Sequence, residues 1–114
     1  IKDPHFPNRM QIFAAFGHFT AILHQQGILH SDYSMGNVLF EPNEQGAQFQ
    51  LVDLNRMRFG QRINCRKGCR NFERIDTDSH ALSTIARAYA QTRGYNEEEC
   101  VRLVLKMRWR KHKK

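Results

Sequence analysis

The sequence has no apolar run long enough to span a bilayer and no recognisable signal peptide. It has no internal repeat and no low-complexity segment apart from its C-terminal tail. It also begins at Ile1 rather than at Met, so we expect it to be cut from a longer chain. With 40% hydrophobic and 25% charged residues, its 114 residues suit a globular fold. We predict a single domain over residues 1–114, which is short for a two-lobed enzyme.

Cysteine is scarce and odd in number, because the chain has only Cys65, Cys69 and Cys100. This excludes a small disulfide-rich framework and suits a reducing compartment. Cys65 and Cys69 could supply two zinc ligands, but no second close pair completes a four-ligand site. The sequence therefore favours ordinary thiols.

Acidic residues are absent from the segment 102–114, which carries seven of the 18 Lys and Arg residues. The other 11 basic residues balance 11 acidic ones, so the net charge of +7 lies in this basic tail. Such a tail can bind an anionic membrane surface or nucleic acid, or it can be a solvated helix end. Nucleic acid is not expected, because no aromatic or arginine stripe accompanies the tail. Its basic residues are Arg102, Lys106, Arg108, Arg110, Lys111, Lys113 and Lys114.

Three stretches have helical patterns. Residues 8–26 carry a broad apolar stripe typical of a buried helix, with Asn8 expected as its cap and Gly27 as its left-handed end. A second helix is predicted between the capping residues 76–79 and Gly94. A third begins after Asn96 with three glutamates and runs through Trp109 toward the basic tail. The stripe of the first helix contains Ile12, Phe16, Phe19 and Leu23.

Two short apolar runs, Val38–Phe40 and Phe49–Asp53, flank the turn-rich segment 41–46 and predict a β-hairpin with a long loop. Residues 55–70 show little periodicity and are expected to form an ordered surface loop. The predicted fold class is therefore mainly α with a small β-hairpin (α+β). Its order is helix, loop, hairpin, loop, helix, helix.

Three polar residues surround the predicted hairpin. Asp32 precedes Asn37 by five residues, and Asp53 ends the second apolar run. Phosphoryl transfer requires one carboxylate for the acceptor hydroxyl, a second carboxylate for magnesium, and a neutral oxygen to complete the metal shell. Since the hairpin returns Asp53 to the end where Asn37 lies, the sequence predicts one shared site.

Residues 28–55 resemble the catalytic and metal-binding loops of the protein-kinase-like superfamily, with an HxDxxxxN motif followed by a DFG-like element. The resemblance implies the C-terminal lobe of a kinase-like fold that uses ATP and Mg. It makes Asp32 the catalytic base, Asn37 and Asp53 the magnesium ligands, and His30 a structural support. It also implies an N-terminal nucleotide lobe before Ile1, without which the fragment would be inactive.

Departures from the protein-kinase pattern disfavour a protein substrate. Ser31 stands where protein kinases often have Arg, Ser34 stands where Ser/Thr kinases have Lys, and Asn55 replaces the DFG glycine. No APE-like sequence follows. The branch that acts on sugars, lipids and other small molecules is therefore favoured.

Within that branch, residues 31–40, 51–59 and 68–74 look most like the lipopolysaccharide kinase family, which uses ATP to phosphorylate Kdo or heptose of the lipid A core. The resemblance suggests that four arginines bind acidic sugar or phosphate oxygens through bidentate contacts. Each of them could instead be a solvated loop cation. These arginines are Arg56, Arg58, Arg66 and Arg70.

The expected activity is thus phosphorylation of a lipopolysaccharide core sugar. The expected place is the cytoplasm of a Gram-negative bacterium or the surface of its inner membrane, reached through the basic tail. A small-molecule kinase of the aminoglycoside or choline type is an alternative built on the same motif. A non-catalytic kinase-like binding module is another, although it would not need Asp32, Asn37 and Asp53 together.

Overall fold

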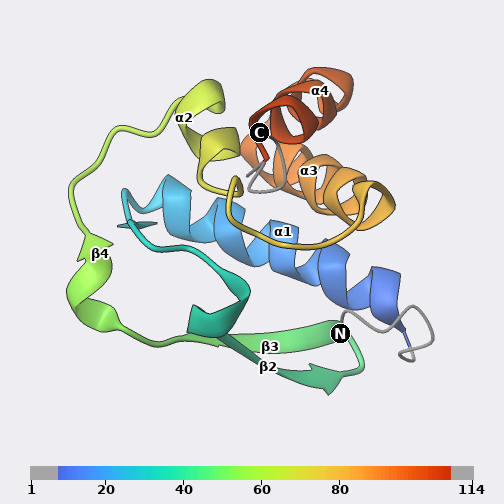
Figure 1. Ribbon diagram of the computed structural model, residues 1–114, viewed down its shortest axis with the longest axis horizontal. Helices are drawn as coiled ribbons and strands as arrows, with labels where there is room; N and C mark the ends of the chain where they lie inside the picture. The colour runs from blue at the N-terminus through green and yellow to red at the C-terminus, as the bar shows by residue number, and fades with distance from the viewer. Residues whose placement is uncertain (1–7, 109–114) are drawn as a thin grey trace, which may run out of the picture.

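The computed structural model describes residues 8–108, in which helices dominate beside two small sheets (Figure 1). This confirms the prediction of mainly α structure with a small β-hairpin. None of the described helices is both long enough and apolar enough to cross a membrane. The helices are α1 (Arg9–Gln25), α2 (Cys65–Arg70), α3 (Ser79–Arg93) and α4 (Glu97–Met107); the strands are β1 (Leu29–His30), β2 (Val38–Asn43), β3 (Gly46–Leu51) and β4 (Met57–Arg58).

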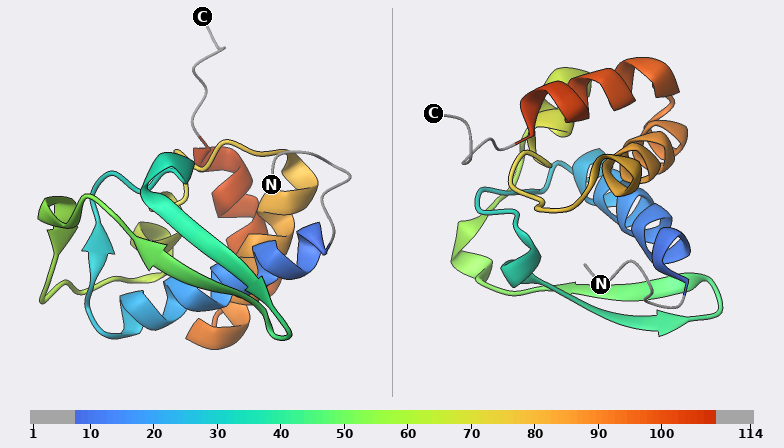
Figure 2. Two further views of the ribbon diagram at one scale, coloured as in Figure 1. Left: turned by 90° about the horizontal axis from the view of Figure 1, so that it is seen from below. Right: turned by 45° about the vertical axis from the view of Figure 1, so that its right-hand side comes forward.

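Helix α1 lies at the centre of the molecule. The β2–β3 hairpin covers one of its sides, α3 packs on the other, and α4 packs on α3 (Figures 1 and 2). Gly17 permits the close approach of α3, because a Cβ atom there would lie 2.4 Å from the carbonyl oxygen of Ile85. The apolar stripe of α1 is thus enclosed on both sides.

The predicted end of α1 is confirmed and the predicted cap is wrong. Gly27 is left-handed (φ 77°), and the Ile28 N–H donates to the Leu23 carbonyl, which closes the last turn. Asn8 is itself left-handed (φ 59°), and its side chain makes no capping hydrogen bond. A capping residue normally has an extended backbone, which places its side chain over the first turn of the helix. The left-handed backbone of Asn8 does not do this.

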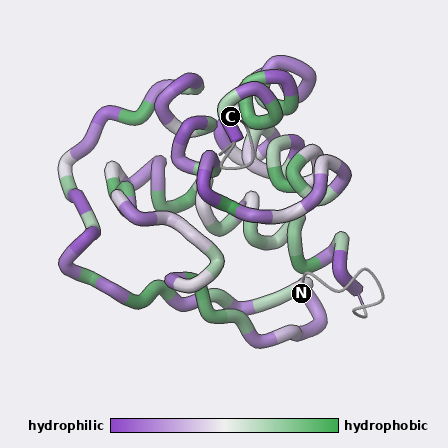
Figure 3. The backbone as a smooth tube through the Cα atoms, in the orientation of Figure 1, coloured by the Kyte–Doolittle hydropathy of each residue, from purple (hydrophilic) through white to green (hydrophobic). Residues whose placement is uncertain are grey.

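Both later helices begin at the predicted caps. The Asp78 carboxylate accepts from the Ala81 N–H and the Asn96 side chain from the Glu99 N–H, each at 2.8 Å. Gly94 is left-handed (φ 75°) between them. Helix α4 alternates apolar and polar residues around its turns (Figure 3), as expected for one buried face. Helix α4 ends at Met107, two residues before the predicted Trp109, and Arg108 after it has a non-helical backbone (φ −55°, ψ 148°). Trp109 and the tail residues Arg110, Lys111, Lys113 and Lys114 lie outside the described residues.

The hairpin is longer and its loop shorter than predicted. Strands β2 and β3 pair antiparallel from Val38↔Leu51 to Asn43↔Gly46, so only two residues form the turn. The other polar residues and the proline of the predicted loop belong to the two paired strands. The strands accommodate them because the outer face of this hairpin is exposed to solvent. Phe49 on the inner face packs against Phe16 of α1, with ring centroids 5.5 Å apart.

The segment 55–70 is not the loop that the sequence predicts. It contains β4 and the short helix α2, whose first turn is capped by the Asn64 side chain accepting from the Lys67 N–H. Two-residue strands and a six-residue helix are too short to leave a periodic pattern. Strand β4 pairs antiparallel with β1, in the register Leu29↔Arg58 and His30↔Met57. This pairing lays the residues before Asp32 beside those after Asp53.

Candidate functional site

His30 links the two halves of the site. Its Nδ1 accepts from the backbone N–H of Asp32 at 3.1 Å, and its Nε2 lies 2.9 Å from the carbonyl oxygen of Val52. Since the amide can only donate and the carbonyl can only accept, the ring must be neutral with its proton on Nε2. The side chain is 1% exposed. These two hydrogen bonds join the backbone of Asp32 to that of Val52, the residue before Asp53.

Asn37 contacts Asp32 directly. Its side-chain amide donates to the Asp32 carbonyl at 2.8 Å and lies 3.3 Å from the Asp32 carboxylate. Both residues are half-buried. Because the Nδ2 atom is engaged in this way, the Oδ1 oxygen of Asn37 is the atom left to face a ligand. The Asn37 carbonyl also accepts from the Val52 N–H at 3.0 Å.

Asp53 has an unusual backbone. It adopts a left-handed conformation (φ 60°, ψ 56°) between β3 and the 3-10 turn Leu54–Arg56. This region is unfavourable for a residue with a Cβ and is often found at functional positions. Its carboxylate is 36% exposed and lies 3.9 Å from the Arg56 guanidinium. Asp53 directly follows Val52, which is bonded to both His30 and Asn37.

Further hydrogen bonds fix the loop that carries Asp32. The Ser31 N–H and hydroxyl both donate to the Arg56 carbonyl, at 2.8 and 2.9 Å. From the other side, the Asn71 amide donates to the His30 carbonyl at 3.0 Å. The structure therefore ties together the backbone segments of all three predicted site residues.

A buried polar network supports Asn71 from beneath. His24 Nε2 lies 2.9 Å from the Asn71 side-chain oxygen, and His24 Nδ1 lies 2.6 Å from the Tyr89 hydroxyl. Arg93 in turn donates to that hydroxyl at 3.0 Å. Burial, assisted by the charge of Arg93 and opposed by the Asn71 hydrogen bond, lowers the pKa of His24 from 6.5 to about 4. The folded chain therefore holds His24 in its neutral form at neutral pH.

The lowered pKa of His24 predicts acid sensitivity. The unfolded chain takes up a proton near pH 6.5 and the folded chain only near pH 4, so stability falls as the pH drops through this window. Between pH 7.5 and 5 we expect a loss of about 2 kcal/mol from this residue. Urea unfolding at both pH values should show that His24→Gln removes this loss, whereas exposed His80→Gln keeps it. An unchanged pH dependence in His24→Gln would contradict the assignment.

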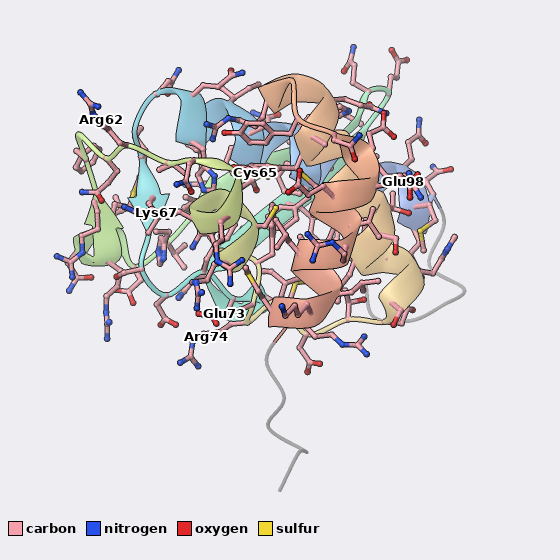
Figure 4. The ribbon with its side chains drawn as sticks, turned by 90° about the horizontal axis from the view of Figure 1, so that it is seen from above. Arg62, Cys65, Lys67, Glu73, Arg74 and Glu98 are labelled. Atoms are coloured by element: carbon pink, nitrogen blue, oxygen red, sulfur yellow. The ribbon has the colours of Figure 1, made fainter. Side chains whose placement is uncertain are left out.

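A pocket of about 240 Å³ opens beside the loop, next to Ser31 and Tyr33. Three cations and one acid contribute to its wall, and Lys67, Glu73 and Arg74 lie on the α2 side of the molecule (Figure 4). These four side chains give the wall of the pocket a net positive formal charge. Its lining is Leu29, Ser31, Tyr33, Lys67, Arg70, Asn71, Glu73 and Arg74.

Of the four arginines named from the sequence, Arg70 alone is among the described residues that line this pocket. Arg56, Arg58 and Arg66 are exposed elsewhere, on the 3-10 turn, on β4 and on α2. Sequence reasoning did not single out Arg74. Arg74 follows α2 in the sequence, and only the folded chain brings it to the same pocket as Ser31.

Comparison with known proteins gives one match. A model described as the lipopolysaccharide kinase (Kdo/WaaP) family matches residues 3–101, which include every residue of the site. Neither the curated proteins nor the solved structures gave a match.

Proposed function

Because this chain belongs to the lipopolysaccharide kinase (Kdo/WaaP) family, we propose that it carries the catalytic and magnesium-binding loops of an ATP-dependent sugar kinase. The observation that supports this most is the hydrogen-bonded unit of His30, Asp32, Asn37 and Val52. It holds the backbone of all three candidate site residues in one place. The acceptor is a hydroxyl of a lipopolysaccharide core sugar, Kdo or heptose.

Asp32 orients the acceptor hydroxyl and takes its proton. The hydroxyl oxygen forms a bond to the γ-phosphorus of ATP, the bond from that phosphorus to the bridging oxygen breaks, and ADP leaves with the electron pair. Asn37 Oδ1 and the Asp53 carboxylate would hold magnesium, and an all-oxygen donor pair of this kind fits that ion. When bound, magnesium neutralises charge on the phosphates.

The basic pocket next to Ser31 supports an acidic or phosphorylated sugar as acceptor. Lys67, Arg70 and Arg74 bring three positive charges to the wall of this pocket, whose lining includes Ser31 and Tyr33 on either side of Asp32 in the sequence. Arg56, Arg58 and Arg66 stay candidates from the family resemblance, with Arg56 beside Asp53. We also propose that the basic tail keeps the enzyme at the cytoplasmic face of an anionic inner membrane.

Arg70→Ala should raise the KM for the sugar acceptor about tenfold and leave kcat nearly unchanged, because Arg70 lines the pocket that we propose for acceptor binding and has no proposed role in the phosphoryl transfer itself. Steady-state kinetics of the full-length protein measure both constants. Arg66→Ala is the matched control, since Arg66 lies one turn away on α2 and does not line the pocket. Equal effects of the two substitutions on KM would show that the pocket does not bind the acceptor.

The acceptor class is tested with the full-length protein, for which we propose a nucleotide-binding lobe from the kinase-like resemblance. Labelled phosphate from ATP should enter lipopolysaccharide core oligosaccharide and neither an aminoglycoside nor choline. Transfer to the soluble amines would favour the small-molecule kinase alternative. Metal-dependent ATP binding without any transfer would favour a binding module.

A further inference from the structure

The three cysteines of the chain meet, although one of them is far away in sequence. Cys65 and Cys69 lie one turn apart on α2, and Cys100 lies on α4, which packs against α2. All three sulfur atoms are within 4.8 Å of one another, and those of Cys65 and Cys100 are 3.6 Å apart. Figure 4 shows Cys65 between the two helices. The ordinary thiols expected from the sequence therefore form a cluster.

We propose that Cys65, Cys69 and Cys100 bind one Zn²⁺ ion. Zinc binds thiolate sulfur at about 2.3 Å in tetrahedral geometry, which separates the sulfurs by roughly 3.8 Å. The observed separations need to change by about 1 Å at most to reach that value. Three soft sulfur donors select a thiophilic ion and distinguish this cluster from the oxygen donors Asn37 and Asp53.

Accessibility differs among the three side chains. Cys69 and Cys100 are fully buried, whereas Cys65 is half-exposed and leaves a path for the ion. The fourth tetrahedral position is taken by water, as in zinc sites with three protein ligands.

Each thiol releases its proton to solvent when it binds zinc, so three protons leave and the cluster carries one net negative charge. Burial raises the pKa of Cys69, and it raises that of Cys100 to about 12. Without metal, both side chains are therefore protonated and weak nucleophiles. Zinc uptake is expected to strengthen as the pH rises. Glu99 is a charged neighbour of the cluster, and its carboxylate raises the pKa of Cys100 further.

Bound zinc would fasten α2 to α4. Asn71 caps the C-terminal end of α2, and its side chain donates to the His30 carbonyl. The ion would thereby fix the position of the loop that carries Asp32 without taking part in phosphoryl transfer. This consequence depends on the proposed function, but zinc binding itself does not.

The test uses the reduced full-length protein, loaded with Zn²⁺ alone and dialysed. Elemental analysis should find one zinc per chain, and Co²⁺ in its place should give a sulfur-to-cobalt charge-transfer band. Chelation should lower Tm by about 5 °C or more. Cys69→Ser and the half-exposed Cys65→Ser should each lose the ion, whereas Asp53→Asn should keep it even if kinase activity is lost.

The wild-type protein alone also decides the question if the serine variants fail to fold. Zinc should protect the half-exposed Cys65 thiol from alkylation in the native state, whereas the same thiol should be alkylated in the metal-free protein. The proposal would be overturned by reduced wild-type protein that retains no zinc, or by zinc that Cys65→Ser and Cys69→Ser retain in full. A Cys65–Cys100 disulfide, with no metal uptake after its reduction, would likewise overturn it.

Discussion

Asp32→Asn should lower kcat about 1000-fold in the full-length protein, because asparagine keeps the shape of the side chain but cannot take a proton. The affinity for ATP should stay within about twofold, since the proposed metal ligands are untouched. The backbone N–H of residue 32 still donates to His30, so the loop should keep its position. Initial rates with saturating acceptor measure this effect.

Glu44→Gln is the control for removal of a carboxylate, because Glu44 lies exposed in the hairpin turn. It should turn over like the unmodified protein, with an unchanged Tm for both variants. Equal turnover by Asp32→Asn and Glu44→Gln would exclude Asp32 as the base.

Asp53→Asn should lower kcat by about 1000-fold or more and raise the magnesium concentration needed for half-maximal rate. Loss of a charged metal ligand removes several kcal/mol of transition-state stabilisation. Asparagine tolerates the left-handed backbone of this position, so the fold should be preserved. Activity measured over a magnesium titration separates the two effects.

Asp53→Gly distinguishes the contribution of the carboxylate from that of the left-handed backbone conformation. Glycine adopts φ 60° without strain, so this variant should be at least as stable as Asp53→Asn and equally inactive. A fully active Asp53→Gly would mean that position 53 matters only for its conformation.

Local sequence signals were sufficient for the long helices. Apolar periodicity and capping residues such as Asp78, Asn96 and Gly94 located α1, α3 and α4 to within a residue or two. The resemblance to the lipopolysaccharide kinase family and the kinase-like α+β fold class are confirmed by the family match. These features depend on residues close together in the chain, or on a motif contained in one short stretch.

The elements that were missed depend on contacts between distant residues. Strands β1 and β4 exist only because they pair with each other, and Cys100 joins Cys65 only because α4 packs on α2. Likewise, His24 could not be linked to the site by sequence, since Asn71 and Tyr89 reach it from two other segments. The assignment of Asp32, Asn37 and Asp53 to one site stays a prediction.

Paramagnetic broadening tests that assignment most directly. Mn²⁺ takes the place of magnesium with ATP on the isotope-labelled full-length protein, and the side-chain NMR signals of Asp32, Asn37 and Asp53 are followed. All three should broaden severely, whereas the Asp78 carboxylate and the Asn96 amide, which cap α3 and α4, should stay sharp. Sharp signals from Asn37 and Asp53 in the presence of bound Mn²⁺ and ATP would contradict the account.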